Sequence, residues 1–83
     1  MAENRVERTI LLDTVDKVRD FTSISTITPL EIDLKQNRFI IDGKSILGIF
    51  SCDLSKPLTL SVYNTNAKNV EKFLASIEQF IVD

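Results

Sequence analysis

The alternation of apolar and charged side chains over residues 30–35 limits the possible folds more than any other feature of this sequence. Leu30, Ile32 and Leu34 stand at alternate positions, and each is followed by a charged residue. A strand with this pattern buries one face and leaves the other face in water. Such strands are typical of antiparallel sheets, whose buried face must be covered by another layer. We therefore expect an antiparallel sheet with helices on one side only.

Three other segments are expected to complete this sheet. Residues 5–12 and 58–63 predict two strands, because apolar residues recur at alternate positions in both. Gln36 and Asn37 predict a tight turn, since Asn tolerates a positive φ. Residues 38–42 then return as a strand, which gives a hairpin with the strand over residues 30–35.

Three segments predict helices. The first starts after a cap at Asp13 or Thr14, and we expect it to fray in the Ser/Thr-rich segment 22–28. The second, over residues 45–52, is too short to be stable alone. The third follows a turn that ends at the capping residue Asn66, and its apolar residues recur at helical spacing over three turns. This stripe consists of Val70, Phe73, Leu74, Ile77, Phe80 and Ile81.

The resulting order of elements is β-α-β-β-α-β-α. A ferredoxin-like fold would need a second helix long enough to cross the sheet, and the helix over residues 45–52 is too short for that. The sequence therefore favours an α/β (α+β) open-faced β-sandwich, with a four-stranded antiparallel sheet and three helices on one face. We expect one domain over residues 1–83, with residues 1–4 disordered.

The charge and hydropathy of the chain exclude several classes of function. The net charge is −2 and neither sign is clustered, so the basic stripe needed for nucleic-acid binding is missing. There is no run of about 20 apolar residues, so we expect no membrane-spanning segment. Residues 1–8 are polar and charged, so we expect no signal peptide and a cytoplasmic protein.

The absence of histidine removes most catalytic chemistry. There is no Ser-His or Cys-His pair to activate a nucleophile and no imidazole to bind a metal. Cys52 is the only cysteine, so it can form neither an internal disulfide nor a zinc site. We interpret Cys52 as a buried, inert thiol because its neighbours are apolar. We expect no enzymatic activity, no metal and no cofactor.

Three acidic residues, Asp13, Asp16 and Asp20, lie at i+3 and i+4 spacings on the first predicted helix. Paired carboxylates could bind a cation or share a proton. Lys17 and Arg19 are interleaved with them, however, and acidic residues in a first helical turn are favoured by the helix dipole. We therefore interpret these acids as the solvated start of a helix.

Ser45 stands where the short helix should begin, after Gly43 and Lys44. Gly-Lys-Ser also ends the nucleotide-binding phosphate loop, but the glycine that such a loop needs five residues earlier is Arg38 here. As an N-cap, Ser45 would stabilise the helix by about 1 kcal/mol. As a regulated phosphosite, it would place about −1.5 to −2 charges at the positive end of the helix. The two roles are compatible, since one hydroxyl can perform them in turn.

The helix that follows Ser45 has more apolar residues than the buried side of a helix on a sheet can hold. A helix that lies on a sheet buries only about half of its circumference. If Ile46 and Ile49 point inward, Leu47 and Phe50 stay partly exposed and form a docking patch for a protein partner. The alternative is an unusually well-buried helix.

Residues 37–57, NRFIIDGKSILGIFSCDLSKP, resemble the centre of the HPr-like protein family. This family includes the phosphocarrier HPr of the phosphoenolpyruvate-dependent sugar phosphotransferase system. The similarity is most specific at residues 44–51, and the order of elements agrees over residues 5–82. The resemblance implies an HPr-type open-faced β-sandwich.

The resemblance also implies two roles for the short helix. Ser45 matches the serine that a dedicated kinase phosphorylates for regulation. Ile46, Leu47 and Phe50 match the apolar surface that meets enzyme I, sugar-transport components and that kinase.

One departure from the family concerns its catalytic segment, Gly-hydrophobic-His-hydrophobic-Arg-Pro. Counted back without gaps from Ser45, the phosphorylatable histidine falls on Thr14, the arginine on Asp16 and the proline on Lys17. None is retained, and the acids at positions 13 and 16 would repel a phosphate. The chain is therefore similar to the regulatory members that lack the histidine and keep the serine, or to a further-diverged branch of the family.

These observations predict a non-catalytic, regulatory protein-binding module, which we expect to be a monomer. The partners implied by the resemblance are HPr serine kinase, components of the phosphotransferase system or a transcription regulator. Two alternatives remain at this point. One is a small-molecule-sensing domain of ferredoxin-like type. The other is an atypical phosphocarrier that uses Thr14, an aspartate or Cys52 as the acceptor.

Overall fold

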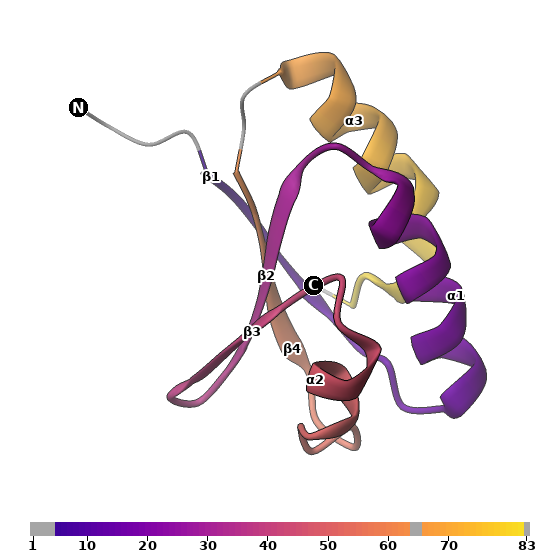
Figure 1. Ribbon diagram of the computed structural model, residues 1–83, viewed down its shortest axis with the longest axis vertical. Helices are drawn as coiled ribbons and strands as arrows, with labels where there is room; N and C mark the ends of the chain where they lie inside the picture. Colours follow the sequence, from indigo (N-terminus) through magenta and orange to yellow (C-terminus); the bar gives the residue numbers. More distant parts are fainter. Residues whose placement is uncertain (1–4, 64–65, 83) are drawn as a thin grey trace.

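The strands and helices follow one another in the predicted order (Figure 1). The computed structural model describes residues 5–63 and 66–82, so the disorder expected for residues 1–4 lies outside the described residues, as does most of the turn before Asn66. None of the helices in these two ranges is long and apolar enough to cross a membrane. The elements are β1 (Arg5–Ile10), α1 (Val15–Ile27), β2 (Glu31–Gln36), β3 (Phe39–Asp42), α2 (Ile46–Phe50), β4 (Leu58–Tyr63), α3 (Ala67–Ser76) and the 3₁₀ turn η1 (Glu78–Phe80).

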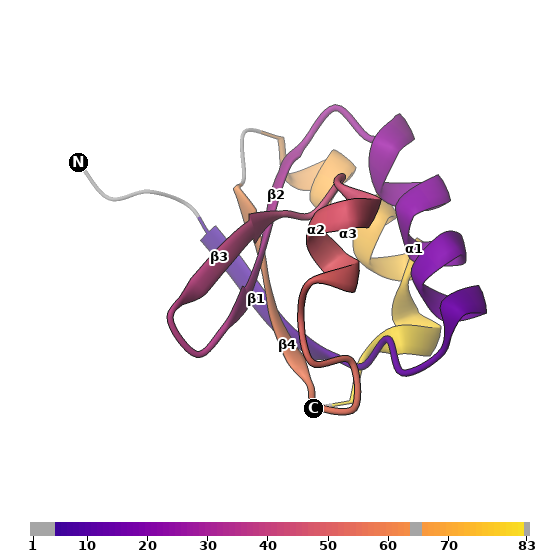
Figure 2. The ribbon, with the colours of Figure 1, turned by 60° about the horizontal axis from the view of Figure 1, so that its bottom comes forward.

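The four strands form one antiparallel sheet in the order β1-β4-β2-β3. Along one row of its inner face, Val62 of β4 lies opposite Val6 of β1 and Ile32 of β2. The three helices lie on this side of the sheet, and Figure 2 shows the opposite side without a helix. The predicted fold class is therefore confirmed, and α2 is far too short for the ferredoxin-like alternative.

The core is organised around Phe21 of α1. Its ring meets Phe73 of α3 edge-on, with ring centroids 6.4 Å apart, and meets Phe80 of η1 at 6.0 Å. Edge-to-face aromatic pairs contribute about 0.5–1.5 kcal/mol beyond the area that they bury. All three rings are buried within the single apolar cluster that the helices and the inner face of the sheet share. Phe21 therefore ties α1 to the C-terminal part of the chain.

Helix α1 does not fray in its serine- and threonine-rich half, contrary to the prediction. The hydroxyls there bond within the fold, as when Thr22 Oγ1 donates to the Val18 carbonyl at 2.9 Å. Ser25 is fully buried, and its Oγ donates to the Gly43 carbonyl at 2.9 Å. These bonds, one within the helix and one to a residue distant in sequence, satisfy the polar groups, so the helix continues to Ile27.

Helix α3 is shorter than its apolar stripe predicted. The N–H of Ile77 is shared between the Phe73 and Leu74 carbonyls, at 3.2 and 3.3 Å, and the chain then tightens into η1. Shared bonds of this kind are common at helix ends. Ile81 leaves the helix altogether and pairs with Ile10 at the outer edge of β1. The stripe thus reaches the core through a helix, a 3₁₀ turn and a β-bridge.

Several boundaries of strands and turns differ by one or two residues from those predicted from the sequence. The hairpin turn lies on Asn37 and Arg38 rather than on Gln36 and Asn37, and Asn37 has the positive φ of 56° that the prediction required. Strand β1 ends at Ile10, two residues early, because the N–H of Leu11 bonds to the C-terminal segment. These shifts leave the pattern of buried and exposed faces unchanged.

Candidate functional site

The start of α2 is held against β2 by a close backbone approach. The N–H of Gly43 donates to the Ile32 carbonyl at 2.8 Å. A Cβ at position 43 would lie 2.5 Å from Ile32 Cγ2, so glycine is the residue that this approach permits. Since the Gly43 carbonyl also accepts the Ser25 hydroxyl, the segment is fixed from the sheet and from α1.

Lys44 and Asp42 complete this anchor. Lys44 Nζ donates to the Thr28 carbonyl at 2.8 Å, beyond the end of α1. The side-chain carboxylate of Asp42 accepts the N–H of Lys44 at 2.9 Å, and the backbone carbonyl of Asp42 accepts the N–H of Ser45 at 3.0 Å. This anchor could not be predicted from the sequence. A hydrogen bond from a lysine side chain to a backbone carbonyl distant in sequence produces no recognisable spacing of residue types.

Ser45 is the N-cap of α2. Its Oγ accepts the N–H of Gly48 at 3.1 Å, and its carbonyl accepts the N–H of Ile49 at 3.0 Å. The residue is half-buried, so its hydroxyl lies close to the surface while it performs the capping role. The structural role that was predicted for Ser45 is therefore present.

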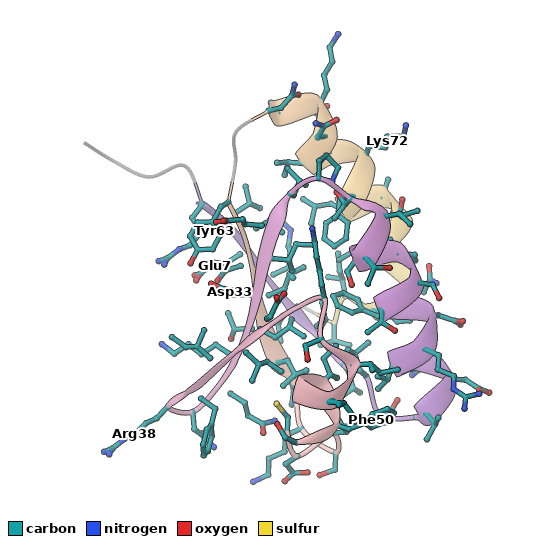
Figure 3. All side chains as sticks on the ribbon, in the orientation of Figure 1. Glu7, Asp33, Arg38, Phe50, Tyr63 and Lys72 are labelled. Carbon is teal, nitrogen blue, oxygen red and sulfur yellow. The ribbon has the colours of Figure 1, made fainter. Side chains whose placement is uncertain are left out.

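The apolar residues of α2 are divided between core and solvent. Ile49 is fully buried, whereas Leu47 is 80% exposed, Phe50 40% and Ile46 37%. In Figure 3, Phe50 lies on the side of α2 toward α1. Ile46 is not buried with Ile49, contrary to one interpretation of the sequence; it stands three residues before Ile49 and four before Phe50, at the border between the buried and the exposed side of α2. We call Ser45, Ile46, Leu47 and Phe50 together the α2 surface.

Thr14 has a structural task of its own as the N-cap of α1. Its Oγ1 accepts the N–H of Lys17 at 3.1 Å. The neighbouring Asp13 carboxylate forms a 2.8 Å ion pair with Lys17 Nζ, which lowers the pKa of Asp13. Asp16 and Asp20 are exposed, in agreement with a solvated helix start. Within residues 5–63 and 66–82, no group of three or more His, Cys, Asp or Glu side chains could hold a metal ion.

Cys52 is only half-buried, which corrects the prediction of a buried thiol. Its Sγ lies 3.7 Å from the Gly48 carbonyl, and the side chain packs against the edge of the core. The predicted helix over residues 45–52 ends at Phe50, so Cys52 lies in the turn that follows.

The open face of the sheet carries a hydrogen-bonded polar row that sequence reasoning missed. Tyr63 Oη donates to Asp33 at 3.0 Å, and the Asp33 carboxylate raises the pKa of Tyr63. Ser61 Oγ donates to Glu7 at 3.1 Å. Figure 3 shows Glu7, Asp33 and Tyr63 close together. Alternation placed these residues on a wet face, but only the pairing of the strands brings them together.

No protein-family model matches this chain, and no curated protein matches it. Among the solved structures that are similar to it are the following two. One is HPr-C-His from Thermoanaerobacter tengcongensis, with a TM-score of 0.65 and 19% identity over 95% of this chain and 93% of that chain. The other is the phosphocarrier protein HPr from Bacillus anthracis strain Ames, with a TM-score of 0.65 and 17% identity over 92% of this chain and 98% of that chain. The chain has the fold of HPr.

Proposed function

We propose that this protein is a non-catalytic, regulatory protein-binding module related to the sugar phosphotransferase system, and that it binds its partners through the α2 surface. One observation supports this most strongly. Three apolar side chains of a five-residue helix, Ile46, Leu47 and Phe50, remain exposed directly after the capping residue Ser45. Exposed apolar side chains gathered on one element are typical of a site that meets another protein.

Phosphorylation of Ser45 would switch this surface. A phosphate adds about −1.5 to −2 charges beside three apolar side chains, and so it would change which partner can dock. Its oxygens would remain at the positive end of α2, where the N–H of Gly48 already donates to Ser45 Oγ. The helix would therefore survive the modification while its surface changed in charge.

Transfer of a phosphoryl group is not part of this proposal. The chain has no histidine, and the residue that the resemblance sets in its place is Thr14. The Thr14 hydroxyl caps α1, and Asp13 and Asp16 beside it would oppose a phosphate. A phosphothreonine also lacks the transfer potential of a phosphohistidine.

The remaining parts of the proposal follow from the likeness to HPr. The partners would be HPr serine kinase, phosphotransferase-system components or a transcription regulator, and the compartment would be the cytoplasm. The protein would act as one domain over residues 1–83 and would need no cofactor.

Intact-mass measurement tests the modification. We expect one added phosphate after incubation with HPr serine kinase and ATP, and its loss in Ser45→Ala. Ser51→Ala is the matched control, because Ser51 is an exposed serine at the other end of α2. Incubation with enzyme I and phosphoenolpyruvate should add nothing. A phosphate gained from enzyme I would contradict the non-carrier role.

A second experiment tests the α2 surface itself. Leu47→Ser should weaken binding to the kinase about tenfold without unfolding the protein, because Leu47 is 80% exposed. Ile27→Ser is the matched control, since Ile27 is 83% exposed at the end of α1. Equal binding by both variants would show that the kinase does not use the α2 surface.

A further inference from the structure

Strand β3 leaves an open edge of the sheet with apolar side chains on both faces. Phe39 is 71% exposed and Ile40 is 65% exposed, and the two point to opposite faces because they are adjacent in a strand. Figure 1 shows the β2–β3 hairpin extending away from the helices. The described residues place no strand beside the outer side of β3. At the opposite edge, by contrast, Ile81 bridges to β1.

The register shows which backbone groups of this edge are free to pair. Ile41 lies opposite Leu34, and the N–H of Gly43 donates to the Ile32 carbonyl at 2.8 Å, so the odd-numbered residues bond to β2. In an antiparallel ladder, alternate residues point their N–H and C=O groups to opposite sides. The N–H and C=O of Ile40 therefore point away from β2, toward the open side of the β3 edge. Exposed strands of this kind are templates for pairing with another chain.

The sequence of the edge is complementary to itself. The turn residue Arg38 gives it a basic end, and the strand Phe39-Ile40-Ile41-Asp42 that follows has an apolar centre and an acidic end. Two copies aligned antiparallel about Ile40 place Arg38 opposite Asp42 of the second copy, at both ends of the contact. They also place Phe39 opposite Ile41 of the second copy and the two Ile40 side chains against each other.

Neighbouring registers lose these pairings. A shift of two residues in one direction sets Ile40 opposite Asp42 and Arg38 opposite Lys44, which opposes like charges. The shift in the other direction sets Ile40 opposite Arg38 and leaves Asp42 without a basic partner. Like charges directly across a strand pair are destabilising, and opposite charges or two apolar residues are stabilising. The antiparallel register about Ile40 is therefore the favoured one.

We infer that β3 pairs with β3 of a second copy of this chain, to give a two-fold dimer with one continuous sheet. A two-fold axis perpendicular to the sheet keeps the helices of both copies on the same side. Two α2 surfaces would then lie on one side of the dimer, so that a partner with two binding sites could engage both. The inference does not depend on the proposed function.

The dimer is expected to be weak. An edge strand of four residues buries less than the roughly 1,200 Å² of a standard interface, so the monomer expected from the sequence should persist in dilute solution. Sedimentation velocity over a range of concentrations should show reversible dimerisation. Amide hydrogen exchange should show the N–H of Ile40 becoming protected as concentration rises, with that of Ile41 unchanged, because Ile41 already bonds to β2.

Substitutions distinguish pairing at the β3 edge from nonspecific hydrophobic association. Ile40→Lys should abolish the dimer, because a charge at the centre of an open edge opposes pairing. Ile27→Lys alters a similarly exposed isoleucine on α1 and should leave the dimer intact. A wild-type protein that stays monomeric at millimolar concentration, or an Ile40→Lys variant that dimerises normally, would overturn the inference.

A charge exchange tests the register. Arg38→Asp and Asp42→Lys should each weaken self-association about tenfold, because each opposes like charges at both ends. An equimolar mixture of the two variants should associate as the wild type does. In the mixed dimer, the aspartate introduced at position 38 meets the lysine introduced at position 42, and the unchanged Asp42 of one variant meets the unchanged Arg38 of the other.

Two further outcomes complete this test. Circular dichroism checks that the Asp42→Lys variant folds, because Asp42 also accepts the N–H of Lys44. A mixture that associates no more tightly than its components would overturn this register. A monomer whose partner binding is lost in Ile40→Lys would assign the edge to a strand of another protein.

Discussion

The two helix starts of this protein use the same cap and differ in what surrounds it. Thr14 accepts the N–H of Lys17 at 3.1 Å, and Ser45 accepts the N–H of Gly48 at 3.1 Å. The first cap opens a long helix whose stability comes from the buried Phe21, and its own neighbours are charged and exposed. The second opens a five-residue helix that leaves apolar side chains in solvent. Capping geometry alone therefore does not distinguish the two helix starts, whereas the exposed apolar side chains beside the second cap do.

The largest difference between the two helices should appear in their phenylalanines. Phe21→Ala should lower the free energy of unfolding by about 4 kcal/mol, because it removes a buried ring that meets two other rings. Phe50→Ala should lower it by only about 1 kcal/mol, since that ring is 40% exposed. Urea unfolding measures both values. Equal losses would mean that α2 is as much a part of the core as α1.

The anchor of α2 is tested by comparing Gly43, which precedes the helix, with Gly48, which lies within it. Gly43→Ala should cost about 3 kcal/mol in urea unfolding, because its Cβ would overlap Ile32 Cγ2 at 2.5 Å. Gly48→Ala should change stability by less than about 1 kcal/mol. Its Cβ would meet Ser45 Oγ at 3.2 Å, and the better helix propensity of alanine offsets that crowding. A neutral Gly43→Ala would show that the start of α2 can move.

The two capping residues should contribute equally to the stability of the fold, but only one of them should be phosphorylated. Thr14→Ala and Ser45→Ala should each lower the free energy of unfolding by about 1 kcal/mol, because each leaves one helix-terminal N–H without its partner. Only Ser45→Ala should abolish phosphorylation by the serine kinase. If Thr14→Ala abolished phosphorylation instead, the phosphorylated residue would be Thr14 at the start of α1.

The smallest effect concerns the charges at the start of α1. The hydrogen bond from Lys17 lowers the pKa of Asp13, so the ionised form is favoured in the folded state. The resulting stability is present above the pKa of Asp13 in the unfolded chain and is lost as the pH falls through its lowered folded pKa. In an NMR titration, Lys17→Met should raise the pKa of Asp13. The pKa of Asp53 should stay low, because the hydroxyl of Ser55 lowers it; a parallel rise would point to a general charge effect.

Sequence patterns predicted the architecture because most of the strands and both longer helices carry their own periodicity. The alternation over residues 30–35 identified the buried face, and the stripe from Val70 to Phe80 identified core residues. The length of α1 was underestimated, since propensity treats serine and threonine as helix breakers while Ser25 finds its partner on Gly43, a residue distant in sequence. Local rules do not reach such contacts.

The candidate site could be predicted only in part for the same reason. Its position before the short helix and the resemblance singled out Ser45, and the structure confirms the predicted cap on α2. The exposure of Ile46 and the contact of Lys44 with Thr28 depend on how α2 lies against α1. The open edge of β3 depends on the strand order, which periodicity does not contain.

The strand order also sets a sequence of folding events. Strands β2 and β3 are joined by a two-residue loop, and such hairpins form in about 1–10 μs. Strands β1 and β4 are separated by more than half of the chain, so their pairing must close a large loop and comes later. The β3 edge is thus exposed before β1 completes the sheet. Refolding from denaturant should therefore lose yield as protein concentration rises, and Ile40→Lys should recover it.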